Sequence, residues 1–182
     1  MRMAIVSVTT RTALVAVCVA ACVSGSAFAH DHDPPRVVLR TAGARQPGHA
    51  YSLEWVSAHG NLCEQMHVDG VPLIPKKGLP LRPGRRIHVR FWKRQRPQHL
   101  SIHGYPRVDS EGGLTGQPRR LSYRLRRKVW AGGGHIWIAT LRAPRFDHVY
   151  LDLFVRWRDE ENCGGAQSMA MVWHLRKGFG SS

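Results

Sequence analysis

The chain has 182 residues, and its 27 lysines and arginines outnumber its 12 acids, which gives a formal net charge of +15. This length suffices for one domain with a sizeable core, and such a charge favours anionic partners while saying nothing about fold. The motifs of serine hydrolases, zinc proteases and phosphate-binding loops are missing from the sequence, so none of these classes is indicated.

The first 29 residues have the pattern of a cleavable export signal. Two arginines supply positive charge without any acid, and residues 12–23 then form an apolar stretch that is too short to span a bilayer. The tripeptide Ala-Phe-Ala at 27–29 provides the small residues that signal peptidase requires. We therefore expect a secreted or extracytoplasmic protein whose mature chain begins at His30.

Two other fates of this segment stay open. Cys22 follows small residues in the pattern of a bacterial lipobox, which would leave the exported chain anchored to a membrane as a lipoprotein. The whole segment could instead remain as a membrane anchor. Outside it, no apolar run approaches the length that a membrane-spanning helix requires.

The charge and cysteine content of the mature chain agree with export. Removing 29 of the 182 residues leaves 153, with 25 basic residues against 12 acids and a net charge of +13. Two cysteines remain, Cys63 and Cys163, and an oxidising compartment favours one disulfide between them. The alternative is a pair of free buried thiols.

A period of two recurs along the mature chain and indicates β-strands. The clearest strand is residues 148–158, in which five apolar residues alternate with a mostly polar set. Residues 167–176 repeat the pattern, and the turn-rich loop between the two segments predicts a hairpin. Weaker alternations predict shorter strands near residues 36–40, 51–55, 87–91, 100–102, 121–125 and 136–138.

Short strands separated by Gly and Pro clusters, without a helical period, predict one all-β domain over residues 36–178, after a flexible polar tail at 30–35. We expect an immunoglobulin-like antiparallel β-sandwich, with a small β-barrel as the alternative. The strand pattern and the segment VYLDLFVRW at 149–157 resemble uncharacterised exported bacterial immunoglobulin-like domains. The resemblance implies the sandwich fold and brings no functional residue with it.

Most of the excess charge lies in residues 82–128, which hold 14 lysines and arginines and only two acids. On two predicted strands of this region the apolar parity faces inward, so the alternate arginines face outward. These arginines are Arg86, Arg90, Arg124 and Arg126. If both strands share a sheet, they form a basic face with Trp92 at its edge, able to bind phosphate or sulfate groups. The alternative is a solvated face that only keeps the protein soluble.

All 11 histidines lie in the mature chain, and most have the parity of ordinary surface residues. The new N-terminus differs, because a free amine on His30, followed by Asp31 and His32, can bind Cu(II) in a square plane. An N-terminal histidine on a sandwich also resembles the copper-dependent polysaccharide monooxygenases. No second histidine for such an oxidative enzyme can be singled out from the sequence.

These observations predict a non-catalytic exported binding or structural domain. Its basic face would meet an anionic cell-envelope polymer, a membrane surface or an acidic protein. No motif for specific nucleic-acid recognition is present. The alternative is extracytoplasmic copper binding through His30 and His32, with copper as the one cofactor considered, and a copper-dependent oxidative enzyme is a further alternative.

Overall fold

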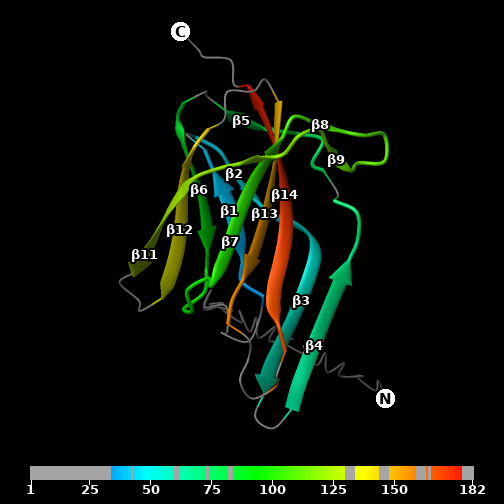
Figure 1. Cartoon of the computed structure of the whole chain (residues 1–182). Helices are drawn as coiled ribbons and strands as arrows, with labels where there is room; N and C mark the ends of the chain where they lie inside the picture. Colours follow the sequence, from blue (N-terminus) through cyan, green and yellow to red (C-terminus); the bar gives the residue numbers. More distant parts are fainter. Residues whose placement is uncertain are drawn as a thin grey trace, which may run out of the picture.

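The computed structural model describes residues 34–41, 43–59, 62–72, 74–81, 84–129, 134–143, 148–158, 163 and 165–177. All regular elements in these ranges are β-strands, and most belong to two sheets packed face to face (Figure 1). The chain is therefore an all-β sandwich, as predicted, and its sheets do not close into a barrel. The expected signal peptide at 1–29 and residues 30–33 of the polar tail lie outside the described residues.

The sheets differ in size, and nearly all their strand pairs are antiparallel. The five-stranded sheet has the order β11 (Tyr123–Val129), β12 (His135–Arg142), β6 (Arg86–Phe91), β1 (Val37–Arg40), β2 (Arg45–Pro47). The seven-stranded sheet has the order β10 (Arg119–Arg120), β7 (His99–Tyr105), β13 (His148–Arg156), β14 (Gln167–Lys177), β3 (His49–His59), β4 (Leu62–Asp69), with β5 (Leu79–Leu81) parallel to β14. A separate ribbon pairs β8 (Arg107–Val108) with β9 (Leu114–Thr115).

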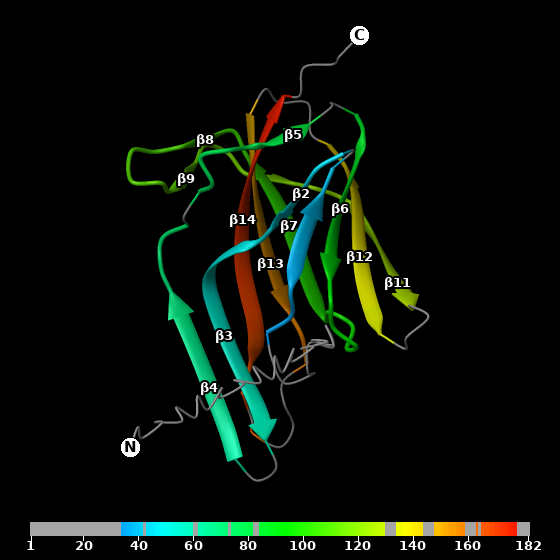
Figure 2. The same ribbon diagram turned by 180° about the vertical axis from the view of Figure 1, so that it is seen from behind.

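The longer strands have the immunoglobulin-like arrangement. The order β11-β12-β6-β1 corresponds to strands D, E, B and A of that fold, and β7-β13-β14 corresponds to C, F and G. The last two strands form the hairpin predicted from the sequence. One insertion departs from the pattern, because β3 and β4 form a long hairpin between the first two core strands and extend the larger sheet beyond β14 (Figure 2).

Aromatic side chains from both sheets fill the centre of the sandwich. The rings of Trp55 and Trp157 lie 5.6 Å apart in an edge-on arrangement, and Phe91 approaches Trp157 from the five-stranded sheet. Trp173 is fully buried, and its indole nitrogen donates to the carbonyl oxygen of Pro47 at 3.1 Å. Large aromatic side chains dominate the energetics of such cores. This packing fixes which alternate side chains of each strand face outward.

The structure departs from the sequence predictions in the inward-facing side of one strand and in several strands that were not predicted. The strand marked by Ile136 and Ile138 is β12, but Trp137 and Ala139, of the opposite parity, pack toward the core. Apolar residues occupy both parities there, so alternation could not show which side faces inward. Six of the described strands are not among the predicted ones, namely β2, β4, β5, β8, β9 and β10. Of these, β5 falls within residues 72–83, where the prolines predict a break between strands.

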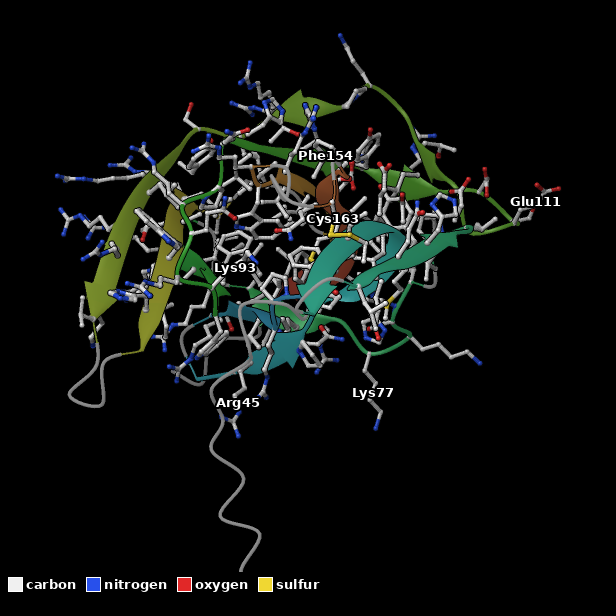
Figure 3. The ribbon with its side chains drawn as sticks, turned by 90° about the horizontal axis from the view of Figure 1, so that it is seen from below. Arg45, Lys77, Lys93, Glu111, Phe154 and Cys163 are labelled. Atoms are coloured by element: carbon white, nitrogen blue, oxygen red, sulfur yellow. A yellow bond between two sulfur atoms is a disulfide. The ribbon has the colours of Figure 1, made fainter. Side chains whose placement is uncertain are left out.

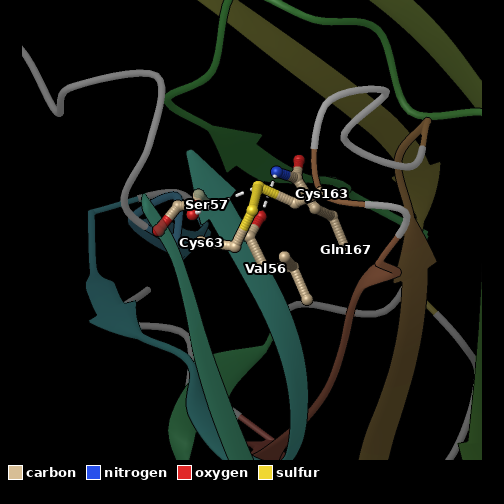
Figure 4. Close-up of a disulfide and its surroundings, with 5 residues drawn as sticks. All are labelled: Val56, Ser57, Cys63, Cys163 and Gln167. Carbon is tan, nitrogen blue, oxygen red and sulfur yellow. Dashed lines mark hydrogen bonds between the residues drawn. A yellow bond between two sulfur atoms is a disulfide. The ribbon is translucent and has the colours of Figure 1, made fainter. Parts of the chain in front are cut away.

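A disulfide joins Cys63 to Cys163, as predicted (Figure 4). Their Cα atoms are 5.7 Å apart, within the range that the bond requires. Cys63 lies on β4, and Cys163 lies between β13 and β14, 100 residues later in the chain. Close by, the side-chain amide of Gln167 donates to the carbonyl oxygen of Val56 at 2.8 Å. The disulfide thus ties the outermost strand of the larger sheet to its central hairpin.

A side-chain hydrogen bond also spans the larger sheet. Tyr51 of β3 donates to the Asp152 carboxylate of β13 at 2.7 Å, across the intervening β14. A bulge places Tyr51 there, since β14 pairs with the residues on either side of it and leaves Tyr51 as the extra residue. Burial raises the pKa of Asp152, while the Tyr51 hydrogen bond, the charge of His103 and a backbone hydrogen bond at Leu153 lower it in part.

Replacing Tyr51 with phenylalanine should lower the free energy of unfolding by about 1–2 kcal/mol at neutral pH, because a half-buried carboxylate loses its donor. The same change removes an influence that lowers the pKa of Asp152, so that pKa should rise further. The loss of stability should therefore shrink as the pH falls and Asp152 becomes protonated in both proteins. Urea denaturation at neutral and acidic pH measures this, and an equal loss at both would contradict the role of the carboxylate.

Candidate anion-binding site

The outward side chains of the five-stranded sheet form rows across neighbouring strands. β12 lies between β6 and β11, and the pairing aligns Arg124 with Thr140 and Thr140 with His88. The same row continues through Arg40 of β1 to Arg45 of β2. Directly opposed residues project on the same side of a sheet. One row therefore carries three arginines and a histidine across all five strands.

The arginines predicted from the sequence lie on this outward face. Arg126 and Arg90 belong to the next row, on either side of Ile138, and Arg86 is paired with Arg142 in a third row. Figure 3 shows nitrogen-tipped side chains gathered along β11 and β12, while Glu111 lies on the far side of the molecule. The condition set by the sequence analysis, that both strands share a sheet, is met.

A hollow of about 900 Å³ opens on this face. It is lined by residues of β6, β12 and β11 and by residues 119–122, where the chain crosses from β10 of the larger sheet to β11. Six of the lining residues are arginines, and none is an aspartate or glutamate. The lining comprises Gly84, Arg86, His88, Arg119, Arg120, Leu121, Ser122, Tyr123, Arg124, Arg126, Thr140, Leu141, Arg142 and Ala143.

His88 lies among these arginines and responds to their charge. Its Nδ1 atom is 3.0 Å from the hydroxyl oxygen of Thr140. Burial, followed by the positive charges of Arg90, Arg86 and Arg40, lowers the pKa of His88. Like charges disfavour a protonated imidazole, so the neighbouring arginines lower the pKa of His88 in the same direction as its burial. A bound anion would oppose that effect.

The structure brings some of the predicted residues into the hollow and leaves others out. Arg86, Arg124 and Arg126 line it. Arg90 is half-buried on the same face and is not part of the lining. Trp92 is also outside it, and the Arg36 guanidinium lies 5.8 Å from the centre of its ring. The hollow therefore lies on the β10 and β11 side of the face, and Trp92, which was expected at the edge of the face, does not line it.

Several lining residues were missed by the sequence analysis. Arg119 and Arg120 precede a predicted strand, and this pair of adjacent arginines was the one local signal of their importance. Arg142 has the outward parity of β12, which also contains Ile136 and Ile138 and so did not look like an outward face in the sequence. No local pattern shows that residues 119–122 fold over the sheet, because that depends on the crossing between two sheets.

The chemistry of the hollow suits tetrahedral oxyanions. Guanidinium groups present rigid forks of N–H donors that match phosphate and sulfate oxygens in pairs. The hydroxyl groups of Ser122 and Thr140 add neutral donors beside them. The lining has six arginines and no carboxylate, so no acidic side chain of the lining neutralises their positive charge.

The copper-binding hypothesis concerns residues at the N-terminus of the predicted mature chain. Within the described ranges, no three His, Cys, Asp or Glu side chains gather as a group able to hold a metal ion. His30 and His32, the proposed copper ligands, lie outside these ranges. The described part of the chain also has no helix long and apolar enough to cross a lipid bilayer.

Comparison of the chain with protein-family models, curated proteins and solved structures gives no match. The resemblance to exported bacterial immunoglobulin-like domains therefore stays a sequence-based expectation. Any functional conclusion depends on the chemistry of the site itself.

Proposed function

We propose that the protein is an exported, non-catalytic domain that binds a phosphate- or sulfate-bearing polymer of the cell envelope through its arginine-lined hollow. The observation that carries this proposal is the lining itself, with six arginines, one histidine and no acid around a single hollow. A solvated face that only aids solubility has no need to concentrate its arginines around a concavity, whereas an anion-binding site does.

Two features favour a polymer over a flat membrane surface or a single small anion. A membrane surface is flat, whereas the arginines line a concave hollow formed by β6, β11 and β12 together with residues 119–122. Its volume also exceeds that of one phosphate, and the row of positive charge continues beyond it through Arg40 to Arg45. An extended chain with repeated anionic groups can occupy the hollow and follow this row.

The salt dependence of binding tests the proposal. Heparin serves as a sulfated probe and inorganic polyphosphate as a phosphate probe, with binding followed by calorimetry. If about six anionic groups are contacted, affinity should fall roughly a thousandfold between about 50 and 200 mM salt, because condensed counterions are released on binding. Polyglutamate of matched charge is the control for an acidic protein partner. Equal affinity for polyglutamate, or binding that salt does not weaken, would refute the assignment.

A further inference from the structure

β4 is a long sheet edge that lacks most of the usual protection, apart from one charged side chain, Glu64, on its core-side face. Among the described strands it pairs only with β3, in unbroken register along all eight residues, and each of those residues is exposed. Natural edges are commonly kept short, bent by bulges, or blocked by lysine or proline. β2 and β10 are short, and β11 carries arginines and a lysine. β4 has neither lysine nor proline and is not short.

The apolar side chains of β4 extend the core-facing side of the larger sheet into solvent. Met66 is paired with Trp55 and Val68 with Leu53, two core residues of β3. Leu62, Met66 and Val68 are nevertheless 72, 49 and 44 % exposed. Exposed apolar side chains along a sheet edge are typical of an edge that accepts another strand.

The hairpin that contains β4 also differs in charge from the rest of the molecule. Residues 46–75 hold three acids, Glu54, Glu64 and Asp69, and no lysine or arginine, in a chain whose net charge is +15. A strand that pairs with β4 should therefore carry positive charge among its apolar residues.

β11 has that chemistry and is the other long edge. Among the described strands it pairs only with β12. Its core-side residues are Tyr123, Leu125, Arg127 and Val129, of which Val129 is 52 % exposed. β4 and β11 lie on opposite sides of the molecule, as Figures 1 and 2 show. A contact between the two edges therefore has to join different copies of the chain.

The two strands match when they are laid antiparallel over their full length. On the core-side face, Leu62 then meets Val129, Met66 meets Leu125, and Val68 meets Tyr123. The fourth position joins the single acid of that face of β4, Glu64, to the single cation of that face of β11, Arg127. A shift by two residues, the smallest that keeps the faces aligned, separates Glu64 from Arg127 and places it against an apolar residue.

We infer that β4 of one copy pairs with β11 of a second copy, so that the protein associates head to tail. Such a contact uses two different surfaces and does not close on itself, so it generates chains of copies. Pairing of β4 with a second β4 would instead join two hairpins that both carry acids and no lysine or arginine. The net positive charge of each copy opposes association at long range, and physiological salt screens that repulsion beyond about 8 Å.

A charge exchange on the full purified chain tests this inference by sedimentation velocity over a concentration series. The wild-type protein should form dimers and longer species. Glu64→Arg and Arg127→Glu should each weaken self-association roughly tenfold or more, because like charges then oppose each other across the strands. A 1:1 mixture of the two variants, and the double variant, should both recover association, since each restores an opposite-charge pair at every junction.

Glu111→Arg and Arg107→Glu provide the matched controls. They make the same charge changes on and beside the β8–β9 ribbon, at exposed positions outside both edges, and should leave association unchanged. The inference is overturned if the wild-type protein stays monomeric at all concentrations. It is also overturned if Glu64→Arg associates like the wild type, or if the double variant, folded by circular dichroism, does not recover association.

Discussion

Replacing Arg86, Arg120, Arg124 and Arg142 together with glutamine should weaken heparin binding roughly a hundredfold near physiological salt. It should also reduce the slope of log affinity against log salt by about 3 to 4 units, since each lost phosphate-type contact removes about one. All four side chains are exposed and line the hollow. Exposed substitutions typically change stability by within about 0.5 kcal/mol each, so the fold should persist.

The choice of these four residues follows from the structure. Arg90 is left unchanged because it is half-buried beside Arg40, where burial lowers its pKa, and it does not line the hollow. Arg120 is included because it belongs to residues 119–122, where the chain crosses between the two sheets, and Arg142 is included because it lies on β12. The variant therefore removes charge from three sides of the hollow.

A control variant separates a defined site from diffuse attraction. Lys77, Arg94, Arg107 and Arg176 are exposed cations outside the hollow, and changing all four to glutamine removes the same net charge. A defined site predicts a loss of less than about threefold for this control, because only weak long-range attraction is affected. Equal losses in the two variants would show that net charge alone attracts the polymer, and the hollow would have no special role.

The basic face was predictable from local sequence, whereas the hollow was not. Alternation on β6 predicts that Arg86 and Arg90 face outward and that Ile87 and Val89 face the core. The structure confirms this arrangement. The hollow needs two long-range facts: β12 pairs between β6 and β11, and residues 119–122 cross between the sheets. Strand order and crossings are set by the packing of distant segments, so a period of two contains no information about them.

The sequence analysis missed β4 for a different reason. A buried strand is recognised by contrast between an apolar and a polar parity. On β4 the core-side parity holds Leu62, Glu64, Met66 and Val68, and both parities are exposed. The contrast is weak because the opposing sheet does not cover this strand, and the strand is defined by its pairing with β3. The Cys63–Cys163 bond, by contrast, followed from the presence of only two cysteines after the predicted signal.

Loss of that disulfide should lower the free energy of unfolding by about 2–5 kcal/mol, the largest stability change expected for this chain from a pair of conservative substitutions. The bond closes a loop of 100 residues, and in the chain-entropy model a longer loop restricts the unfolded state more. For a domain of about 150 residues this corresponds to a melting temperature lower by roughly 10 °C. Cys63→Ser combined with Cys163→Ser is the variant, measured by chemical denaturation without reductant.

The position of the bond predicts where the structure loosens first. Among the described strands, β4 has one strand neighbour, β3, and the disulfide is its covalent tie to the connection between β13 and β14. Hydrogen exchange of the double serine variant should therefore accelerate most in β4 and the adjoining part of β3, while β6, β12 and β13 keep protection in proportion to global stability. Wild-type protein treated with reductant should behave like the variant. Uniform acceleration across both sheets would instead mean that the bond acts only on the unfolded chain, and unchanged stability would rule out a structural role for it.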